Sequence, residues 1–282
     1  MLIFDNIEVE ELPTRYGRML VPKKDSVIGR SLRLYGEWAE HEISMVSTLL
    51  TDGDVILDVG ANIGTHALAL ASRFPCSPVF AFEPQPLAAM LLAANICLSS
   101  KPNCKPMPMA CGKLAAIGDV DPAYDDLDWN IGAVSLRDAF LQADKTTQQD
   151  NFAYPTLVVP LDACRFPGRV QLIKIDVEGM EDDVIAGAVG LIERDRPVIC
   201  FEVLTLETMR RCREQLLSRG YELRWLETNA FNDQNFNNNN QNVWALGETS
   251  ILALPVSDDF RVRFLKRVSG NETDIPRSAY AR

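Results

Sequence analysis

The stretch from 54 to 64, DVILDVGANIG, constrains the fold more than any other part of the sequence. Its apolar run is interrupted only by Asp58 and ends in a loop bounded by Gly60 and Gly64. Residues 65–73 then contain neither Gly nor Pro and are rich in Ala and Leu, so they favour a helix. A strand, a glycine loop and a helix start present backbone N–H groups and the positive end of a helix dipole. This pattern predicts a binding site for an anionic group of a small polar ligand.

The order of the glycines bears on which ligand binds. A dinucleotide-binding loop has the pattern G-x-G-x-x-G, whereas this loop has Gly60, Asn62 and Gly64, with Thr65 at the position of the third glycine. This departure weakens the interpretation as an NAD site. The next predicted strand ends at Glu83, whose carboxylate can accept two charge-assisted hydrogen bonds from a ribose diol. Together the two features predict S-adenosylmethionine as the cofactor.

Composition and charge narrow the possible partners. A chain of 282 residues with 47% hydrophobic residues is long enough to bury one main α/β domain. Its net charge of −11 argues against nucleic acid as a partner, because binding a phosphate backbone requires clustered Lys and Arg. The seven cysteines include no C-x-x-C pair, which indicates a reducing, cytoplasmic setting without a zinc site. We expect neither a signal peptide nor a run of about 18 apolar residues that would span a membrane.

Strand and helix patterns alternate along the chain. They predict an N-terminal lid and helix (1–50), a methyltransferase-sized main domain (51–256) and a tail (257–282). Within the main domain, an inserted hairpin is expected at about 112–165 and an Asn-rich loop at 229–242. The alternation predicts a doubly wound, mostly parallel seven-stranded sheet. In such sheets, ligands bind beyond the carboxyl ends of the strands.

Four further local expectations follow from particular residues. The third strand, expected at 104–110, contains Pro106 and Pro108, which cannot donate to a strand ladder and therefore place it at a sheet edge. One helix is expected over 37–50, and another directly after Gly179. The residues before 36 are expected to be irregular, with short extended pieces.

Several stretches resemble the FkbM family of S-adenosylmethionine-dependent methyltransferases. They are YGEW at 35–38, DVGANIGTH at 58–66, AFEPQP at 81–86, NIGAVSL at 130–136, LIKIDVEGMEDDVIAGA at 172–188 and RPVICFEV at 196–203. The resemblance covers about 30–255 and implies a class I methyltransferase (Rossmann-like) fold that O-methylates a sugar or natural-product hydroxyl. It also implies that Glu37 and Trp38 close over the site. The residues predicted to contact the cofactor are Glu37, Asp58, Gly60, Asn62, Gly64, Thr65, His66 and Glu83.

Transfer of a methyl group to a hydroxyl requires in-line placement and a base that takes the hydroxyl proton. Lys174, Asp176 and Glu178 alternate along a predicted strand and therefore face the same way. We hypothesise that Asp176 or Glu178 is the base or orients the acceptor. Alternatively, Asp176 pairs with Lys174 or caps the following helix. His41 and His66 are either packed histidines or further candidates for the base.

Other interpretations stay open at this stage. Asp176, Glu178 and Glu202 are a potential site for a divalent cation, although we predict that no metal is held. The Asn-rich loop is either a flexible polar segment or a contact for a hydroxyl-rich substrate. The expected acceptor is a small hydroxylated molecule, either sugar or polyketide-like. The chain as a whole could instead be an NAD-dependent oxidoreductase or a non-catalytic protein that binds S-adenosylmethionine.

Overall fold

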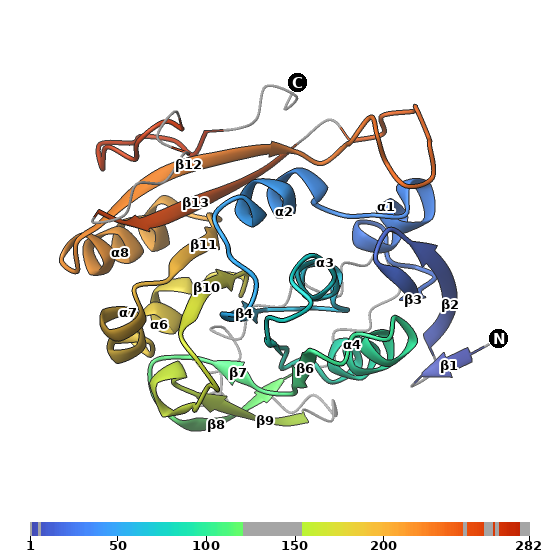
Figure 1. Cartoon of the computed structure of the whole chain (residues 1–282), viewed down its shortest axis with the longest axis horizontal. Coiled ribbons are helices and arrows are strands. Elements are labelled where there is room, and N and C mark those ends of the chain that lie inside the picture. Colours follow the sequence, from blue (N-terminus) through green and yellow to red (C-terminus); the bar gives the residue numbers. More distant parts are fainter. Residues whose placement is uncertain are drawn as a thin grey trace, which may run out of the picture.

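The computed structural model describes residues 2–4, 7–120, 154–244, 247–256, 262 and 265–276. Its centre is a seven-stranded sheet (Figure 1). In spatial order the strands are β12 (Tyr221–Asn229), β13 (Gly247–Pro255), β11 (Val198–Glu202), β10 (Val170–Ile175), β4 (Val55–Val59), β5 (Val79–Phe82) and β6 (Cys104–Met107). β13 runs antiparallel to both of its neighbours, and every other pair in this sheet is parallel. The predicted doubly wound, mostly parallel seven-stranded sheet is therefore confirmed.

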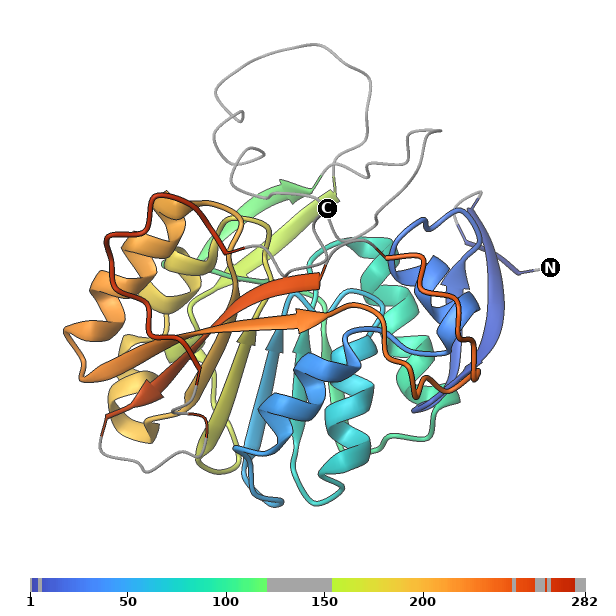
Figure 2. The same ribbon diagram turned by 90° about the horizontal axis from the view of Figure 1, so that it is seen from above.

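Helices lie on both faces of this sheet (Figure 2). One apolar cluster takes residues from α1 (Ile28–Tyr35), α2 (Glu40–Ser47), α3 (Thr65–Arg73) and α4 (Pro86–Leu98). The other takes residues from α6 (Glu181–Ala186), α7 (Val189–Asp195) and α8 (Leu206–Leu217). Ile56 and Leu172 belong to the first cluster, whereas their neighbours Leu57 and Ile173 belong to the second. Because β4 and β10 are covered on both sides, they are apolar along almost their whole length.

The N-terminal region is more regular than its sequence predicts. β1 (Leu2–Phe4), β2 (Ile7–Thr14) and β3 (Gly17–Pro22) form an antiparallel sheet. Buried Asn95 of α4 accepts a hydrogen bond from Leu20 N (2.6 Å) and donates one to Leu20 O (3.1 Å). The same amide donates to Ile63 O, next to the glycine loop. These partners are far apart in the sequence, so local patterns carry no sign of them.

The helix expected over 37–50 is shorter in the structure. α2 begins at Glu40, because Ala39 has a left-handed backbone (φ 53°), and it ends at Ser47. Before it, α1 ends at Gly36, which is also left-handed (φ 69°). Left-handed backbone conformations at Gly36 and Ala39 therefore separate two helices, α1 and α2, where the sequence predicts a single helix.

A third sheet, with three strands, follows β6 in the chain. Its strands, in the order β7-β9-β8, are β7 (Ala110–Cys111), β9 (Tyr154–Val159) and β8 (Ala116–Val120), followed by the 3₁₀ turn η1 (Leu161–Ala163). β8 and β9 are antiparallel. The inserted hairpin expected at about 112–165 stays a prediction, because residues 121–153 lie outside the described part of the chain. β6 carries Pro106 and occupies the edge of the main sheet, as its prolines predict.

The helix expected after Gly179 is divided into α6 and α7. The break falls at Gly187, where a Cβ would lie 2.0 Å from the carbonyl oxygen of Gly112. Only glycine fits at this position, and the close approach of the two backbones ends α6. Among the described residues, no helix combines the length and the apolar character needed to cross a membrane.

Candidate active site

The loop between β4 and α3 is tightly fitted to the strand beside it. At Gly60 (φ 87°) a Cβ would lie 1.7 Å from the carbonyl oxygen of Asp176, so only glycine can occupy this position. Gly64 (φ 101°) precedes α3, and Asn62 also has a left-handed backbone (φ 49°). The loop therefore passes directly against the end of β10.

The backbone N–H groups of this loop are already used within the protein. Each N–H from Gly60 to Gly64 donates to a protein acceptor at 2.7 to 2.9 Å. The first turn of α3 begins at Thr65, and N–H groups in a first helical turn have no intrahelical acceptor. The donors suited to an anionic group therefore belong to Thr65 and His66 rather than to the glycine loop itself.

Glu83 joins this loop to the end of β5. One carboxylate oxygen accepts from Asn62 N and the other from Gln85 N, both at 2.8 Å. The side chain is buried, and burial raises the pKa of Glu83 to about 7. Each carboxylate oxygen keeps a second lone pair. Glu83 thus fixes two loops and can still accept hydrogen bonds from a ligand.

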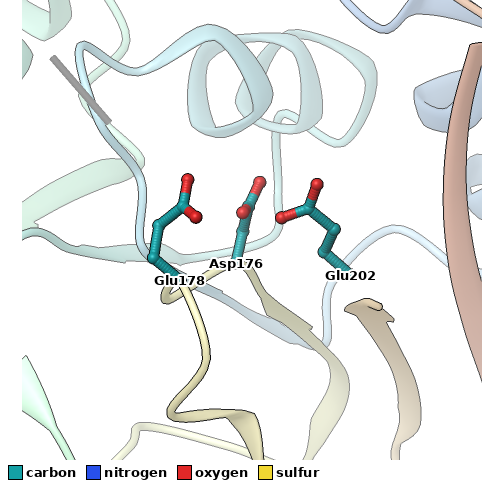
Figure 3. A group of neighbouring side chains, drawn as sticks. All are labelled: Asp176, Glu178 and Glu202. Atoms are coloured by element: carbon teal, nitrogen blue, oxygen red, sulfur yellow. The ribbon is translucent and has the colours of Figure 1, made fainter. Parts of the chain in front are cut away.

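Three carboxylates meet at the carboxyl ends of β10 and β11 (Figure 3). One oxygen each from Asp176, Glu178 and Glu202 lie within 4.8 Å of one another. Asp176 and Glu178 also line the same cavity as Gly60 and Glu83. The structure therefore places the residues predicted for catalysis next to residues predicted for cofactor binding.

The three carboxyl groups differ in protonation. Burial would raise the pKa of Asp176, but the Lys174 ammonium, 3.1 Å away, the hydrogen bond with Glu202 and the charge of His66 together lower it. Burial and the Asp176 charge raise the pKa of Glu202 to about 10, so Glu202 carries a proton that it shares with Asp176. Burial, Asp176 and Glu181 raise the pKa of Glu178 to about 7. At neutral pH the cluster thus holds an ionised Asp176, a neutral Glu202 and a partly ionised Glu178.

A buried ionic network extends from this cluster to α2. One oxygen of Glu42 lies 3.4 Å from His66 Nε2 and 3.6 Å from Lys174 Nζ, and the other accepts from Ser250 Oγ at 2.8 Å. Burial would raise the pKa of Glu42, but Lys174 and His66 lower it to about 2. Asp58 is buried next to Lys174 in the strand register, with one carboxylate oxygen that lacks a hydrogen-bond partner among the described residues. His66 therefore belongs to a charged interior network.

Glu42 was not among the predicted site residues, although its sequence context carries a signal. It lies four residues before Val46, so the two share a helix face, and Val46 belongs to the apolar core. A carboxylate on the apolar face of a helix requires a buried cationic partner. The identity of that partner, Lys174, could be found only from the tertiary structure.

Two other predicted residues have different neighbours. The Glu37 carboxylate accepts from Arg15 Nε (2.6 Å), Asn232 Nδ2 (2.7 Å) and Phe236 N (3.0 Å), so it holds the Asn-rich loop in place. His41 Nδ1 lies 3.1 Å from Asn229 O, and its side chain lines a second cavity, beneath that loop. Glu37 and His41 thus contact the loop rather than the carboxylate cluster.

The carboxylate cluster has donors that suit a divalent cation. Three oxygens within 4.8 Å are the hard ligands that Mg²⁺ prefers. Metal ligands must be deprotonated, however, and Glu202 carries a proton at neutral pH while Lys174 already compensates Asp176. A cation would therefore have to displace a proton and compete with a buried ammonium.

Two curated proteins show partial similarity to this chain. Methyltransferase sdnD of Sordaria araneosa is 28% identical over 160 residues, which cover 49% of this chain and 61% of that protein. Hexuronic acid methyltransferase AglP of Haloferax volcanii is 28% identical over 142 residues, which cover 50% of this chain and 53% of that protein. The chain thus matches between about half and three fifths of the length of these two relatives.

Two solved structures are similar to this chain at low sequence identity. Methyltransferase FkbM from Methylobacillus flagellatus KT is 16% identical, covering 73% of this chain and 45% of that chain with a TM-score of 0.42. A SAM-dependent O-methyltransferase from Thermotoga maritima is 12% identical, covering 89% of this chain and 87% of that chain with a TM-score of 0.47. The family model of the methyltransferase FkbM domain matches residues 58–223, which include the glycine loop, Glu83 and the carboxylate cluster. Because that match covers more than half of the chain, the protein belongs to the FkbM family of S-adenosylmethionine-dependent methyltransferases, with a class I fold.

Proposed function

We propose that this chain binds S-adenosylmethionine at the ends of β4 and β5 and transfers its methyl group to a hydroxyl of a saccharide or natural-product acceptor. The observation that carries this proposal is the shared cavity, in which Gly60 and Glu83 face Asp176 and Glu178. A cofactor held by the first two residues has its reactive end within reach of the second two. The names of the similar proteins sdnD and AglP agree with methyl transfer.

The predicted cofactor residues have different roles in this proposal, and Asn62 N positions the Glu83 carboxylate. Glu83 accepts from the ribose hydroxyls through its remaining lone pairs, and the first-turn N–H groups of Thr65 and His66 face the methionine carboxylate. Asp58 and the glycines shape the floor of the site. Glu37 acts at a distance from the cofactor, because its carboxylate already binds three protein donors of the neighbouring segments.

Glu178 is the proposed base. A base works best when its pKa lies near the working pH, and the pKa of Glu178 is raised to about 7. The acceptor oxygen forms a bond to the methyl carbon as the carbon–sulfur bond breaks toward sulfur, and Glu178 takes the hydroxyl proton. Asp176 stays ionised beside Lys174 and, through its charge, raises the proton affinity of Glu178. Both carboxylates assist only near the acceptor, since negative charge beside the sulfonium would stabilise the ground state.

Incubation with methyl-labelled S-adenosylmethionine and a panel of glycosides and hydroxylated natural products tests the function. We expect label in an O-methyl product, identified by mass spectrometry, together with one equivalent of the demethylated cofactor. Label found on nitrogen or carbon of the acceptor would contradict the assignment to a hydroxyl. The same assay with NAD in place of the labelled cofactor should yield no product.

Replacement of Glu83 by Ala is expected to weaken S-adenosylmethionine binding by on the order of a hundredfold, because charge-assisted hydrogen bonds to two hydroxyls are lost. Isothermal titration calorimetry measures the affinity. Glu207→Ala is the matched control, because Glu207 is an exposed carboxylate on α8 and its loss should leave the affinity unchanged. An unaltered affinity in folded Glu83→Ala protein would remove Glu83 from the cofactor site.

Treatment with EDTA is expected to leave the methylation rate unchanged. The proton on Glu202 and the ammonium of Lys174 already compensate the charge of the cluster. The rate is measured after dialysis against EDTA, and again after addition of Mg²⁺. Loss of activity on dialysis that Mg²⁺ restores would show instead that Asp176, Glu178 and Glu202 hold a cation.

A further inference from the structure

The turn between β10 and α6 carries Glu178, the proposed base. Glu178 has a left-handed backbone (φ 52°), and so has Gly179 (φ 99°). A residue with a Cβ rarely adopts this conformation and keeps it only where the surrounding structure enforces it. The side chain of Glu178 points to the same side as those of Asp176 and Glu202 (Figure 3). The direction of the base thus depends on a backbone conformation that needs support from neighbouring residues.

Contacts with other parts of the fold hold the two ends of this turn. At its start, Asp176 N donates to Val59 O at 2.8 Å, and the Asp176 carbonyl oxygen packs against Gly60. At its end, buried Met180 packs with Val158 of β9 in a small apolar cluster. These contacts leave the middle of the turn to be fixed separately.

Glu181 makes the contact in the middle of the turn. It is the first residue of α6, and its side chain folds back so that Oε1 accepts a hydrogen bond from Gly179 N at 3.0 Å. The whole residue is buried, with an exposed fraction of 0%. Its other carboxylate oxygen is also buried and has no hydrogen-bond partner among the described residues. A buried carboxylate with one unpaired oxygen is costly, which sets Glu181 apart from an ordinary residue at a helix start.

The other acids at the start of α6 have a different environment. Glu181, Asp182 and Asp183 all lie in the first turn, where negative charge favours the helix dipole. The Asp182 carboxylate forms an ion pair with Arg211 of α8 at 2.7 Å, whereas the Glu181 carboxylate reaches back to the turn before the helix. The dipole explains an acid at this helix start, but it does not explain why Glu181 is fully buried.

Glu181 also acts on Glu178 through its charge. Burial raises the pKa of Glu181 above its usual value, and the hydrogen bond from Gly179 N opposes that rise. Burial, the Asp176 charge and the Glu181 charge raise the pKa of Glu178 to about 7. Glu202 of β11 also faces Glu178 but is neutral at neutral pH, since its own pKa is raised to about 10. The backbone contact and the charge of Glu181 therefore act on the same residue.

We propose that Glu181 is a positioning residue, which holds the turn before α6 in its left-handed conformation and so keeps the Glu178 carboxylate in the reaction cavity. In the described part of the chain, Glu181 is not among the residues that line this cavity, so it acts through Glu178 and not on the substrate. The proposal rests on the proposed methyl transfer, in which Glu178 is the base. It adds that this base works only while a buried carboxylate holds the adjoining backbone.

Two substitutions separate the backbone contact from the charge. Glu181→Gln keeps an oxygen that can accept from Gly179 N, whereas Glu181→Ala removes it. We expect Glu181→Ala to slow single-turnover methyl transfer about 10²-fold at the pH where the rate is maximal, because a small displacement of a reacting group costs about that much. Glu181→Gln should retain most of the original rate. The calorimetric affinity for S-adenosylmethionine should be unchanged in both variants, which also shows that they are folded.

The pH dependence is a readout that a purely structural contact would not move. Glu178 acts when it is deprotonated, and removal of the Glu181 charge lowers the pKa of Glu178. The rise of the rate with pH should therefore lie at lower pH in Glu181→Gln than in the original protein. Carbon-13 NMR of the Glu178 carboxyl group, assigned by its loss in Glu178→Gln, should show the same shift without any acceptor present.

Asp182→Asn is the matched control, because it removes a first-turn acid and its ion pair with Arg211 but keeps the Gly179 contact. Its rate and its pH dependence should match those of the original protein. Full rates and an unshifted Glu178 titration in both Glu181 variants would overturn the proposal, and so would equal losses in Asp182→Asn. Absence of methyl transfer by the original protein would instead count against the proposed function, while the NMR titration would still test the effect of Glu181 on Glu178.

Discussion

Replacement of Glu178 by Gln is expected to slow methyl transfer by about 10²- to 10⁴-fold, the usual contribution of a positioned base. Gln has nearly the same shape as Glu but cannot take the hydroxyl proton. The affinity for S-adenosylmethionine should change little, because Glu178 is assigned to the acceptor side of the cavity. Single-turnover rates with saturating acceptor, together with calorimetric cofactor binding, separate the two effects.

The pH dependence gives this prediction a second readout. A base acts when it is deprotonated, so the rate of the original protein should rise with pH and level off above the pKa of Glu178, about 7. The Glu178→Gln variant should lack this rise. An intact rise in the variant would assign the titrating base to another group, with His66 as the next candidate.

Glu202→Gln is the matched control for the base. Glu202 is protonated at neutral pH, since its pKa is raised to about 10, and Gln preserves a neutral group that donates toward Asp176. Activity should therefore be largely retained. A loss as large as that of Glu178→Gln would mean that an ionised Glu202 takes part in the reaction.

Replacement of Lys174 by Met is expected to lower the free energy of unfolding by about 3–5 kcal/mol near neutral pH, the usual cost of removing one partner from a buried ion pair. Lys174 is 4% exposed and lies beside Glu42 and Asp176, so its removal leaves two carboxylates with less compensation. Urea denaturation followed by circular dichroism measures the change. Lys23→Met is the control, because the Lys23–Glu8 pair is exposed and should contribute far less.

The stability loss should depend on pH with a definite sign. The pKa of Glu42 is lowered from 4.5 to about 2 in the folded protein, so its ionisation stabilises the fold above pH 4.5 and this contribution is lost as pH falls toward 2. Without Lys174, the pKa of Glu42 rises, and the variant can relieve the unpaired charge by taking up a proton. The deficit of Lys174→Met should therefore shrink on acidification. A deficit that stays constant with pH would indicate lost packing rather than lost charge compensation.

Much of the fold follows from local patterns. The helix at 65–73 has the predicted bounds, and the strands at 55–59 and 79–82 lie in the stretches where strands are expected, because apolar runs, helix-forming residues and glycine turns act over a few residues. The proline in β6 correctly indicates a sheet edge, since its missing N–H excludes an inner position. The N-terminal sheet was not predicted, because its attachment depends on Asn95, in a distant helix.

The loop at 229–242 shows that function, too, depends on contacts with residues far away in the sequence. Its composition allows either a flexible segment or a substrate contact, and the choice depends on partners in the residues from Arg15 to Glu37. Contacts with those partners fix the conformation of the amide-rich loop, which forms part of the wall of the cavity that His41 lines. The N-terminal elements bind side-chain amides of the loop, and these contacts determine which loop residues face the cavity that His41 lines.

The sequence alone determined the glycine turn, the acids that end β5 and β10, and the alternation of strands and helices, because each depends on neighbours along the chain. The tertiary structure alone decided which buried side chains of the site are ionised. Glu42, His66, Lys174 and Ser250 come together only when α2 packs against a sheet in which β13 lies between β12 and β11, and β11 pairs with β10. Electrostatic energies depend on separation in space and on burial, and neither quantity can be read from separation along the chain.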